Sequence, residues 1–163
     1  MKNKFRFLTL VLILISFIYC GSNTSLYAAG KGYQFQYKGV SIAPHDKVDS
    51  LLKKLGKPNK RTKKASCAYD GEDITYRYNG ITIIAYSNKK GGTEYLMEVE
   101  ITGKNIKTKE GIKVGSTTKD MIKKYGKEKD NFGMYTYKKG KSGIQFMTEN
   151  NKIEKIIYFS DMK

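Results

Sequence analysis

The side chains best suited to acid–base chemistry are few in this sequence. His45 is the only histidine, and it stands next to Asp46, so two members of a catalytic triad are adjacent. A triad also requires a nucleophile at hydrogen-bonding distance, and adjacency along the chain does not supply that geometry. We therefore expect His45 to be a surface residue that precedes a helix. We assign no catalytic residue, and we expect a protein that is not an enzyme.

Two groups of carboxylates suggest other chemistry. Asp70, Glu72 and Asp73 lie within four residues, but they lack the alternating ligands and the distal glutamate of a calcium-binding loop. Glu98 and Glu100 share one face of an expected strand, where they would act as general acid and base only inside a substrate pocket. We expect the first group to form a polar turn and the second to be solvated.

Residue counts exclude several kinds of site. One histidine and two cysteines rule out a three-histidine zinc site, a four-cysteine zinc site and a network of disulfides. The glycine pair Gly91-Gly92 is not followed by the Lys-Ser or Lys-Thr of a phosphate-binding loop. The sequence therefore predicts neither a metal site nor a cofactor.

Positive charge is the strongest chemical signal. The 163 residues include 31 Lys and Arg against 15 Asp and Glu, which gives a net charge of +16. One basic segment holds seven cations within twelve residues: Lys53, Lys54, Lys57, Lys60, Arg61, Lys63 and Lys64. Such a density attracts polyanions through long-range electrostatics and counterion release. A second cluster lies between Lys119 and Lys129.

The kind of cation limits the partner. The chain has 28 lysines and three arginines, and arginine is the residue that reads bases and phosphates with two hydrogen bonds. We therefore expect no sequence-specific nucleic-acid binding. Anionic cell-wall polymers or lipid headgroups fit the lysines better, and lysines that only keep the domain soluble remain the alternative.

Residues 1–29 are typical of a signal peptide. Three basic residues precede an uncharged run from Phe7 to Ile18. Twelve helical residues span about 18 Å, which is short of the roughly 30 Å hydrocarbon core of a membrane. Two processing routes stay open: cleavage after Ala28 or Ala29, and lipidation of Cys20. Either route exports a single mature domain, residues 30–163, which is secreted or anchored at the outer side of the cell envelope.

The mature domain keeps the basic balance, because residues 30–163 hold 28 basic and 15 acidic side chains, a net charge of +13. Cys67 is then the only thiol able to form a disulfide, so no internal bridge is expected. We expect Cys67 to be a small buried residue and the fold to be held by packing.

The mature chain repeats one pattern, first in residues 39–56 and again in residues 111–126. In the first copy Asp46 can cap a helix that ends at Gly56, and in the second Ser116 or Thr117 caps a helix that ends at Gly126. Each helix has one apolar stripe. The stripes are Val48, Leu51, Leu52 and Leu55, then Thr118, Met121, Ile122 and Tyr125.

After each helix the sequence alternates with period 2, which indicates strands. Asn79-Gly80 between two such runs predicts a hairpin. The predicted strands cover 74–78, 81–86 and 95–102, then 134–138, 144–148 and 153–159. The fold class is therefore α+β, with two αβββ repeats at about 39–103 and 104–160. Because neither half would bury much apolar surface alone, we expect one antiparallel sheet with both helices on one face.

The opposite sheet face would then be open to a partner. Alternation assigns eight residues of the first half to it: Thr75, Arg77, Thr82, Ile84, Tyr86, Leu96, Glu98 and Glu100. Thr136, Gln145 and Met147 extend it in the second half. A single bulge would move every later side chain to the other face.

The doubled phrase resembles known exported domains. A Gly-hydrophobic lead, a Ser/Thr cap and a helix ending in Lys-Lys-(Leu/Tyr)-Gly before a meander are similar to the tandem repeats of β-lactamase-inhibitory-protein-like domains and of SmpA/OmlA-type outer-membrane lipoproteins. The resemblance covers about residues 39–160. It implies an exported protein that binds other proteins through a sheet face or loops, although fold alone does not fix function. The first copy departs from the pattern at Ala43-Pro44-His45.

Together these features predict a secreted or cell-envelope binding module that engages a protein partner through the open sheet face or the repeat loops. The alternative is an electrostatic binder of anionic envelope polymer or membrane surface through the basic segment.

Overall fold

The computed structural model describes residues 32–67 and 69–161, and it shows an α+β fold. The predicted signal peptide with Cys20 lies outside these residues. The helices are α2 (Val48–Leu55) and α3 (Thr118–Tyr125). The strands are β1 (Phe35–Tyr37), β2 (Val40–Ile42), β3 (Lys60–Ala65), β4 (Glu72–Tyr78), β5 (Ile81–Ser87), β6 (Tyr95–Ile101), β7 (Met134–Lys139), β8 (Ser142–Glu149) and β9 (Lys152–Ser160). Neither described helix is long and apolar enough to cross a membrane.

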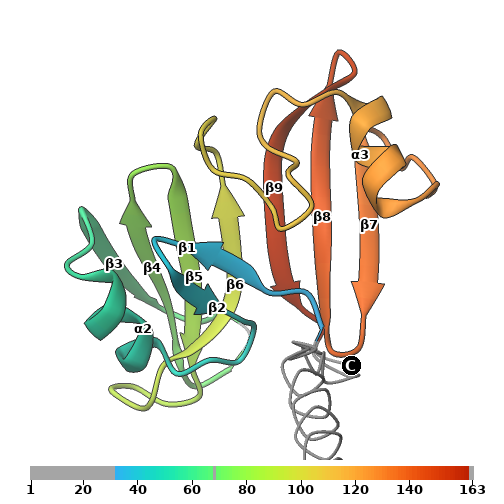
Figure 1. Cartoon of the computed structure of the whole chain (residues 1–163). Helices are drawn as coiled ribbons and strands as arrows, with labels where there is room; N and C mark the ends of the chain where they lie inside the picture. Colours follow the sequence, from blue (N-terminus) through green and yellow to red (C-terminus); the bar gives the residue numbers. More distant parts are fainter. Residues whose placement is uncertain (1–31, 68, 162–163) are drawn as a thin grey trace, which may run out of the picture.

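Seven of the strands form one antiparallel sheet in the order β3-β4-β5-β6-β9-β8-β7. The six strands predicted from period-2 alternation are confirmed as β4 to β9. Strands β6 and β9 pair at the centre, from Glu98 opposite Phe159 to Ile101 opposite Ile156. The strands before and after residue 103 therefore share one continuous sheet. Figure 1 shows α2, α3 and the β1–β2 hairpin on the same side of that sheet.

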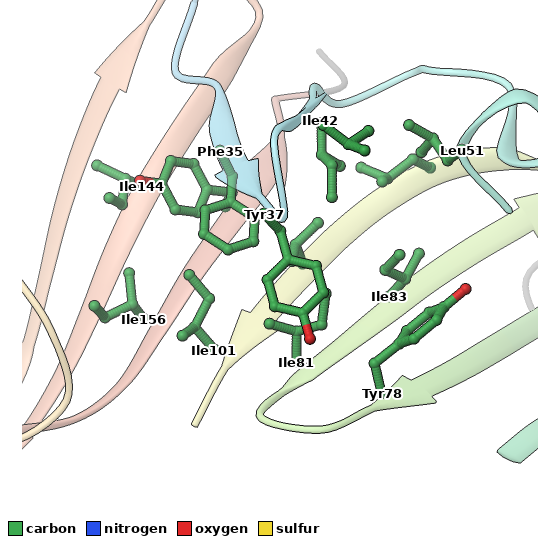
Figure 2. Packing of buried hydrophobic residues seen from close by; sticks show 14 of the residues in the cluster. Phe35, Tyr37, Ile42, Leu51, Tyr78, Ile81, Ile83, Ile101, Ile144 and Ile156 are labelled. Carbon is green, nitrogen blue, oxygen red and sulfur yellow. The ribbon is translucent and has the colours of Figure 1, made fainter. Parts of the chain in front are cut away.

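The β1–β2 hairpin was not predicted, and it joins the core. Figure 2 shows Phe35 and Tyr37 of β1 among buried isoleucines of the sheet. The Phe35 ring lies 5.4 Å from that of Tyr158 on β9, and Tyr33 lies 6.3 Å from Tyr125 on α3. The N-terminal segment thus packs against α3 and β9, two elements of the second half of the chain.

Strand β3 was also not predicted, because it carries no apolar stripe. All six of its residues are exposed, and it pairs with β4 from Lys60 opposite Arg77 to Ala65 opposite Glu72. Carboxylates near it replace hydrophobic contacts: Lys63 Nζ lies 2.6 Å from Glu72 Oε2 and Arg61 Nη2 lies 2.7 Å from Glu94 Oε1. Lysines on an edge strand also discourage pairing between copies of the chain.

The chain that leads into α2, residues 43–48, is fixed by hydrogen bonds to β6 and the residue before it. The His45 N–H donates to the Leu96 carbonyl at 2.8 Å, and the Leu96 N–H donates to the Asp46 carbonyl at 2.9 Å. The Val48 N–H donates to the Glu94 carbonyl at 3.0 Å. We call residues 43–48 the first lead segment.

The second lead segment, residues 113–118 before α3, makes the corresponding bonds to β9 and its turn. The Gly115 N–H donates to the Ile153 carbonyl at 2.7 Å, and the Ile153 N–H donates to the Ser116 carbonyl at 2.9 Å. The Thr118 N–H donates to the Asn151 carbonyl at 3.0 Å. The two lead segments therefore make the same three backbone hydrogen bonds, with donors and acceptors at corresponding positions.

The starts of the two helices differ in their side chains. Thr117 caps α3, because its Oγ1 accepts from the Asp120 N–H at 3.1 Å. The N-cap of α2 is Lys47, which makes no side-chain cap bond. The prediction that Asp46 caps α2 is therefore wrong: its Oδ2 accepts from the Ala43 N–H at 2.8 Å instead.

The ends of the two helices match. Gly56 and Gly126 stop α2 and α3 as predicted, with φ of 78° and 96°, in the left-handed region that glycine enters without strain. A tyrosine from the following strands closes each end. Tyr78 Oη donates to the Gly56 carbonyl and Tyr137 Oη to the Gly126 carbonyl, both at 2.9 Å.

Candidate binding face

The sheet side away from the helices carries the residues predicted for the open face, with one exception. Strand register aligns Thr75, Ile84, Glu98 and Phe159 in one row across β4, β5, β6 and β9. The next row contains Arg77, Thr82, Glu100, Ile157, Gln145 and Thr136. Tyr86 and Met147 flank these rows. We call this surface the open face.

Leu96 does not belong to the open face, so its prediction is wrong. It is fully buried and pairs with Ala85 on the core side of the sheet. The register between β5 and β6 shifts by one residue between Ile84 and Ala85, so that Glu98 is opposite Ile84 while Leu96 is opposite Ala85. A bulge of this kind reverses the facing of every residue beyond it.

The centre of the open face is apolar and partly shielded. Ile84, Glu98 and Phe159 are half-buried, and Ile157 is only 9% exposed although it is outside the core cluster. The Phe159 ring lies over Gly143 on β8: a Cβ added to Gly143 would come within 2.1 Å of it. This close packing holds the ring against the sheet.

Three charged side chains lie in the middle of this apolar surface. Glu98 and Glu100 are two residues apart on β6, and Lys155 Nζ on β9 lies 2.9 Å from Glu100 Oε1. Burial raises the pKa of Glu98, the negative charge of Glu100 raises it further, and Lys155 lowers it. The expectation that both carboxylates are simply solvated therefore needs correcting for Glu98, which is half-buried.

Three tyrosines border the open face. The ring of Tyr86 lies 6.4 Å from that of Tyr69 and 5.9 Å from that of Tyr95. Tyr69 Oη donates to Asp73 Oδ1 at 3.0 Å, and burial is the main cause that raises the pKa of Tyr69. Tyr69 is 37% exposed, so aromatic surface is accessible at this rim.

Sequence reasoning missed the contribution of β9 to the face. Ile157 and Phe159 alternate with Ile156 and Tyr158 on the core side. The signal was present, because β9 is apolar at consecutive positions, as expected for a strand that contacts other residues on both faces. Its place beside β6 was the missing information.

The seven cations of the basic segment fall into two groups, three with ion pairs and four without one among the described residues. Arg61, Lys63 and Lys64 form ion pairs with Glu94, Glu72 and Asp73, and the hydrogen bond from Lys63 is the main cause that lowers the pKa of Glu72. The acidic cluster at residues 70–73 thus supplies counter-ions for β3. The other four cations are exposed, and no ion pair of theirs is found among the described residues: Lys53, Lys54, Lys57 and Lys60.

His45 is exposed, as predicted, and its Nε2 contacts the Ser160 Oγ. A serine beside a histidine gives two groups of a triad, but the neighbouring Asp46 carboxylate is directed to the Ala43 N–H. Cavities of about 490 Å³ and 350 Å³ lie elsewhere, at the start of α3 and beside the Asn79-Gly80 turn. The His45–Ser160 contact therefore links β9 to the first lead segment.

Cys67 is exposed and carries a free thiol, so the prediction of a buried cysteine is wrong. It lies in the loop between β3 and β4. Within residues 32–67 and 69–161, no group of three or more His, Cys, Asp or Glu side chains is arranged to hold a metal ion.

Comparison of the chain with protein-family models, with curated proteins and with solved structures finds no match. The resemblance to β-lactamase-inhibitory-protein-like and SmpA/OmlA-type domains therefore stays a prediction.

Proposed function

We propose that this protein is an exported, non-enzymatic binding module that engages a protein partner through the open face. In this proposal two αβββ units, preceded by matching lead segments, form the single domain 30–163. Export by the predicted signal peptide would present it as a secreted protein or, if Cys20 is lipidated, at the outer side of the cell envelope.

One observation carries the proposal: within residues 32–67 and 69–161, helices and a hairpin cover one side of the sheet, and no element covers the other side. Both helices and the hairpin pack on the covered side, while Ile84, Tyr86 and Phe159 remain half-buried on the other. Aromatic and aliphatic side chains that surround a few charges are typical of interface centres. Half-buried apolar side chains that gather on an uncovered sheet face support an interaction site there.

The test is capture of partners from envelope and culture extracts by the exported protein. We expect Ile84→Lys and Phe159→Glu each to remove the captured partner, because each places a charge in the apolar centre of the interface. The matched control is Gln36→Lys, which is exposed on the hairpin side. Thermal unfolding must show that the variants stay folded. Retention of every partner by both folded variants would disprove the proposal.

A second function is favoured by the four exposed lysines without ion pairs in the described chain, from Lys53 to Lys60. We propose, as the alternative, weak electrostatic binding of an anionic wall polymer or membrane surface. Retention on vesicles that contain anionic lipid, or on purified wall polymer, should fall steeply with salt. Neutralising these four lysines should abolish it. Neutralising Lys63 and Lys64 should change it less, because their charges are already paired. Salt-independent retention would exclude this function.

A further inference from the structure

We propose that the partner of the open face presents a lysine or arginine flanked by apolar side chains, and that Glu98 is the counter-ion of this cation. The inference rests on the proposed function, and it adds the chemistry of the partner. It follows from the position of Glu98, from the local charge balance and from the apolar residues on either side.

The position of Glu98 makes its ionised carboxylate unfavourable in the unbound protein. Its neighbours across the sheet are Ile84 on β5 and Phe159 on β9. Apolar side chains on both sides displace water from the carboxylate without offering it hydrogen bonds. A carboxylate removed from water is unfavourable unless a donor or a cation compensates it. A partner that supplies a cation would provide that compensation.

The charge balance around Glu98 leaves one negative charge uncompensated. Two carboxylates, Glu98 and Glu100, share one lysine, and Lys155 is hydrogen-bonded to Glu100. The other cations on this side of the sheet lie farther from Glu98. Arg77 is on β4, two strands from β6 and roughly 10 Å away at the usual spacing of strands, and Lys60 is one strand beyond it. Lys138 is on β7, three strands from β6, and pairs with Asp161. On a chain with a net charge of +16, this local negative charge attracts a cation where most of the surface repels one.

The residues that flank Glu98 define the rest of the partner. Ile84 and Phe159, both half-buried, present apolar surface on both sides of the carboxylate. A strongly hydrated or purely cationic segment would leave this surface uncovered. Apolar residues next to the cation would cover it, and the Phe159 or Tyr86 ring could contact the cation from its face. Polyanions fit poorly, because they would meet the two carboxylates.

The test uses a defined probe rather than the unidentified partner. A phage-displayed library of random peptides is selected on the exported protein, and the affinities of the selected peptides are measured as synthetic peptides. We expect them to contain a lysine or arginine between apolar residues. Their affinity should fall about tenfold or more with Glu98→Gln, since a hydrogen bond to a charged group is lost. Lys155→Gln should raise the affinity, because it removes the competing cation.

The matched control is Glu149→Gln, which makes the same charge change at the exposed end of β8. It should leave the affinity within about twofold, as for a charge outside the contact. Binders that lose affinity with Ile84→Lys but not with Glu98→Gln would overturn this inference and leave the proposed function standing. A selection in which no binder responds to either variant would overturn both.

Discussion

The two lead segments adopt one backbone arrangement with different side chains. In each, the residue before the helix pairs with the start of the last strand of a meander, Lys47 with Tyr95 and Thr117 with Lys152. In the first, the Asp46 carboxylate accepts a hydrogen bond from the Ala43 N–H. In the second, the Ser116 hydroxyl accepts one from the Lys113 N–H. Pairing with the sheet therefore determines the backbone shape of each lead segment, and different polar side chains can complete it.

The differences between the lead segments concern stability. His45 adopts a positive φ of 69° where Gly115 has 87°, and only glycine does so without strain. Thr117 caps α3, whereas Lys47 gives α2 no side-chain cap. The first helix is therefore less well supported at its start. Strand β2 of the hairpin packs beside α2, and both contribute residues to the same core.

The largest expected effect concerns the two halves of the sheet, β3 to β6 and β7 to β9. It tests whether these halves unfold together. Phe35 is 1% exposed and reaches Tyr158 from the hairpin. Phe35→Ala should lower the free energy of unfolding by about 3–5 kcal/mol, measured by urea denaturation as one transition. Phe132→Ala, at a fully exposed residue, should have no such effect. Two separate transitions would show that the two halves of the sheet unfold independently.

Substitutions at the positive-φ position, His45 and Gly115, measure how far backbone strain separates the two lead segments. Gly115→Ala should cost about 1–2 kcal/mol, the price of a left-handed conformation for a non-glycine residue. An added Cβ there meets no atom within 4 Å, so the cost is confined to the backbone. His45→Gly should raise the free energy of unfolding by relieving the backbone strain. The loss of the contact between His45 and Ser160 reduces this gain. Thermal and urea unfolding would measure both, and a neutral Gly115→Ala would contradict the assigned conformation.

Exchanging the helix caps should give an effect of similar or smaller size. Thr117→Ala removes the hydrogen bond to the Asp120 N–H and should cost about 1 kcal/mol. Lys47→Thr should stabilise α2 by a smaller amount, because the site has the extended backbone of an N-cap but no cap bond. Lys47→Ala serves as the control for loss of the lysine. Equal losses for Thr117→Ala and Lys47→Ala would refute the difference between the helices.

The smallest effect concerns the open face. The pKa of Glu98 is raised on folding, so its ionisation destabilises the folded state. Glu98→Gln should therefore raise the free energy of unfolding at neutral pH, by less than about 1 kcal/mol because the group is half exposed. The gain should appear as the pH rises through about 4, the unfolded pKa of a glutamate, and become constant above the raised pKa. Urea unfolding against pH, with Glu149→Gln as control, would show it. A gain independent of pH would exclude this cause.

Much of the fold could be predicted because local patterns coincide with tertiary requirements. The period-2 runs that became β4 to β9 and the glycines that end both helices depend on neighbours along the chain. The β1–β2 hairpin also alternates, with Phe35, Tyr37, Val40 and Ile42 buried. It was missed because two runs of three residues are too short to stand out.

The failures share a physical cause: each was decided by a residue distant in sequence. Strand β3 has no hydrophobic period, since carboxylates from β4 and beyond stabilise it. Leu96 turns to the core because of a bulge that alternation cannot reveal. The contributions of Phe159 and Ile157 to the open face follow from the pairing of β9 with β6. Only the topology brings these together.

The contact between Phe35 and Tyr158 also constrains the order of events in biosynthesis. Phe35 is among the earliest residues of the described chain to be synthesised, and its partner on β9 is among the last. The hydrophobic core therefore cannot be completed until β9 has left the ribosome, and contacts of such long range slow folding. For a polypeptide threaded through a translocation channel, this delay would keep it unfolded until it has crossed.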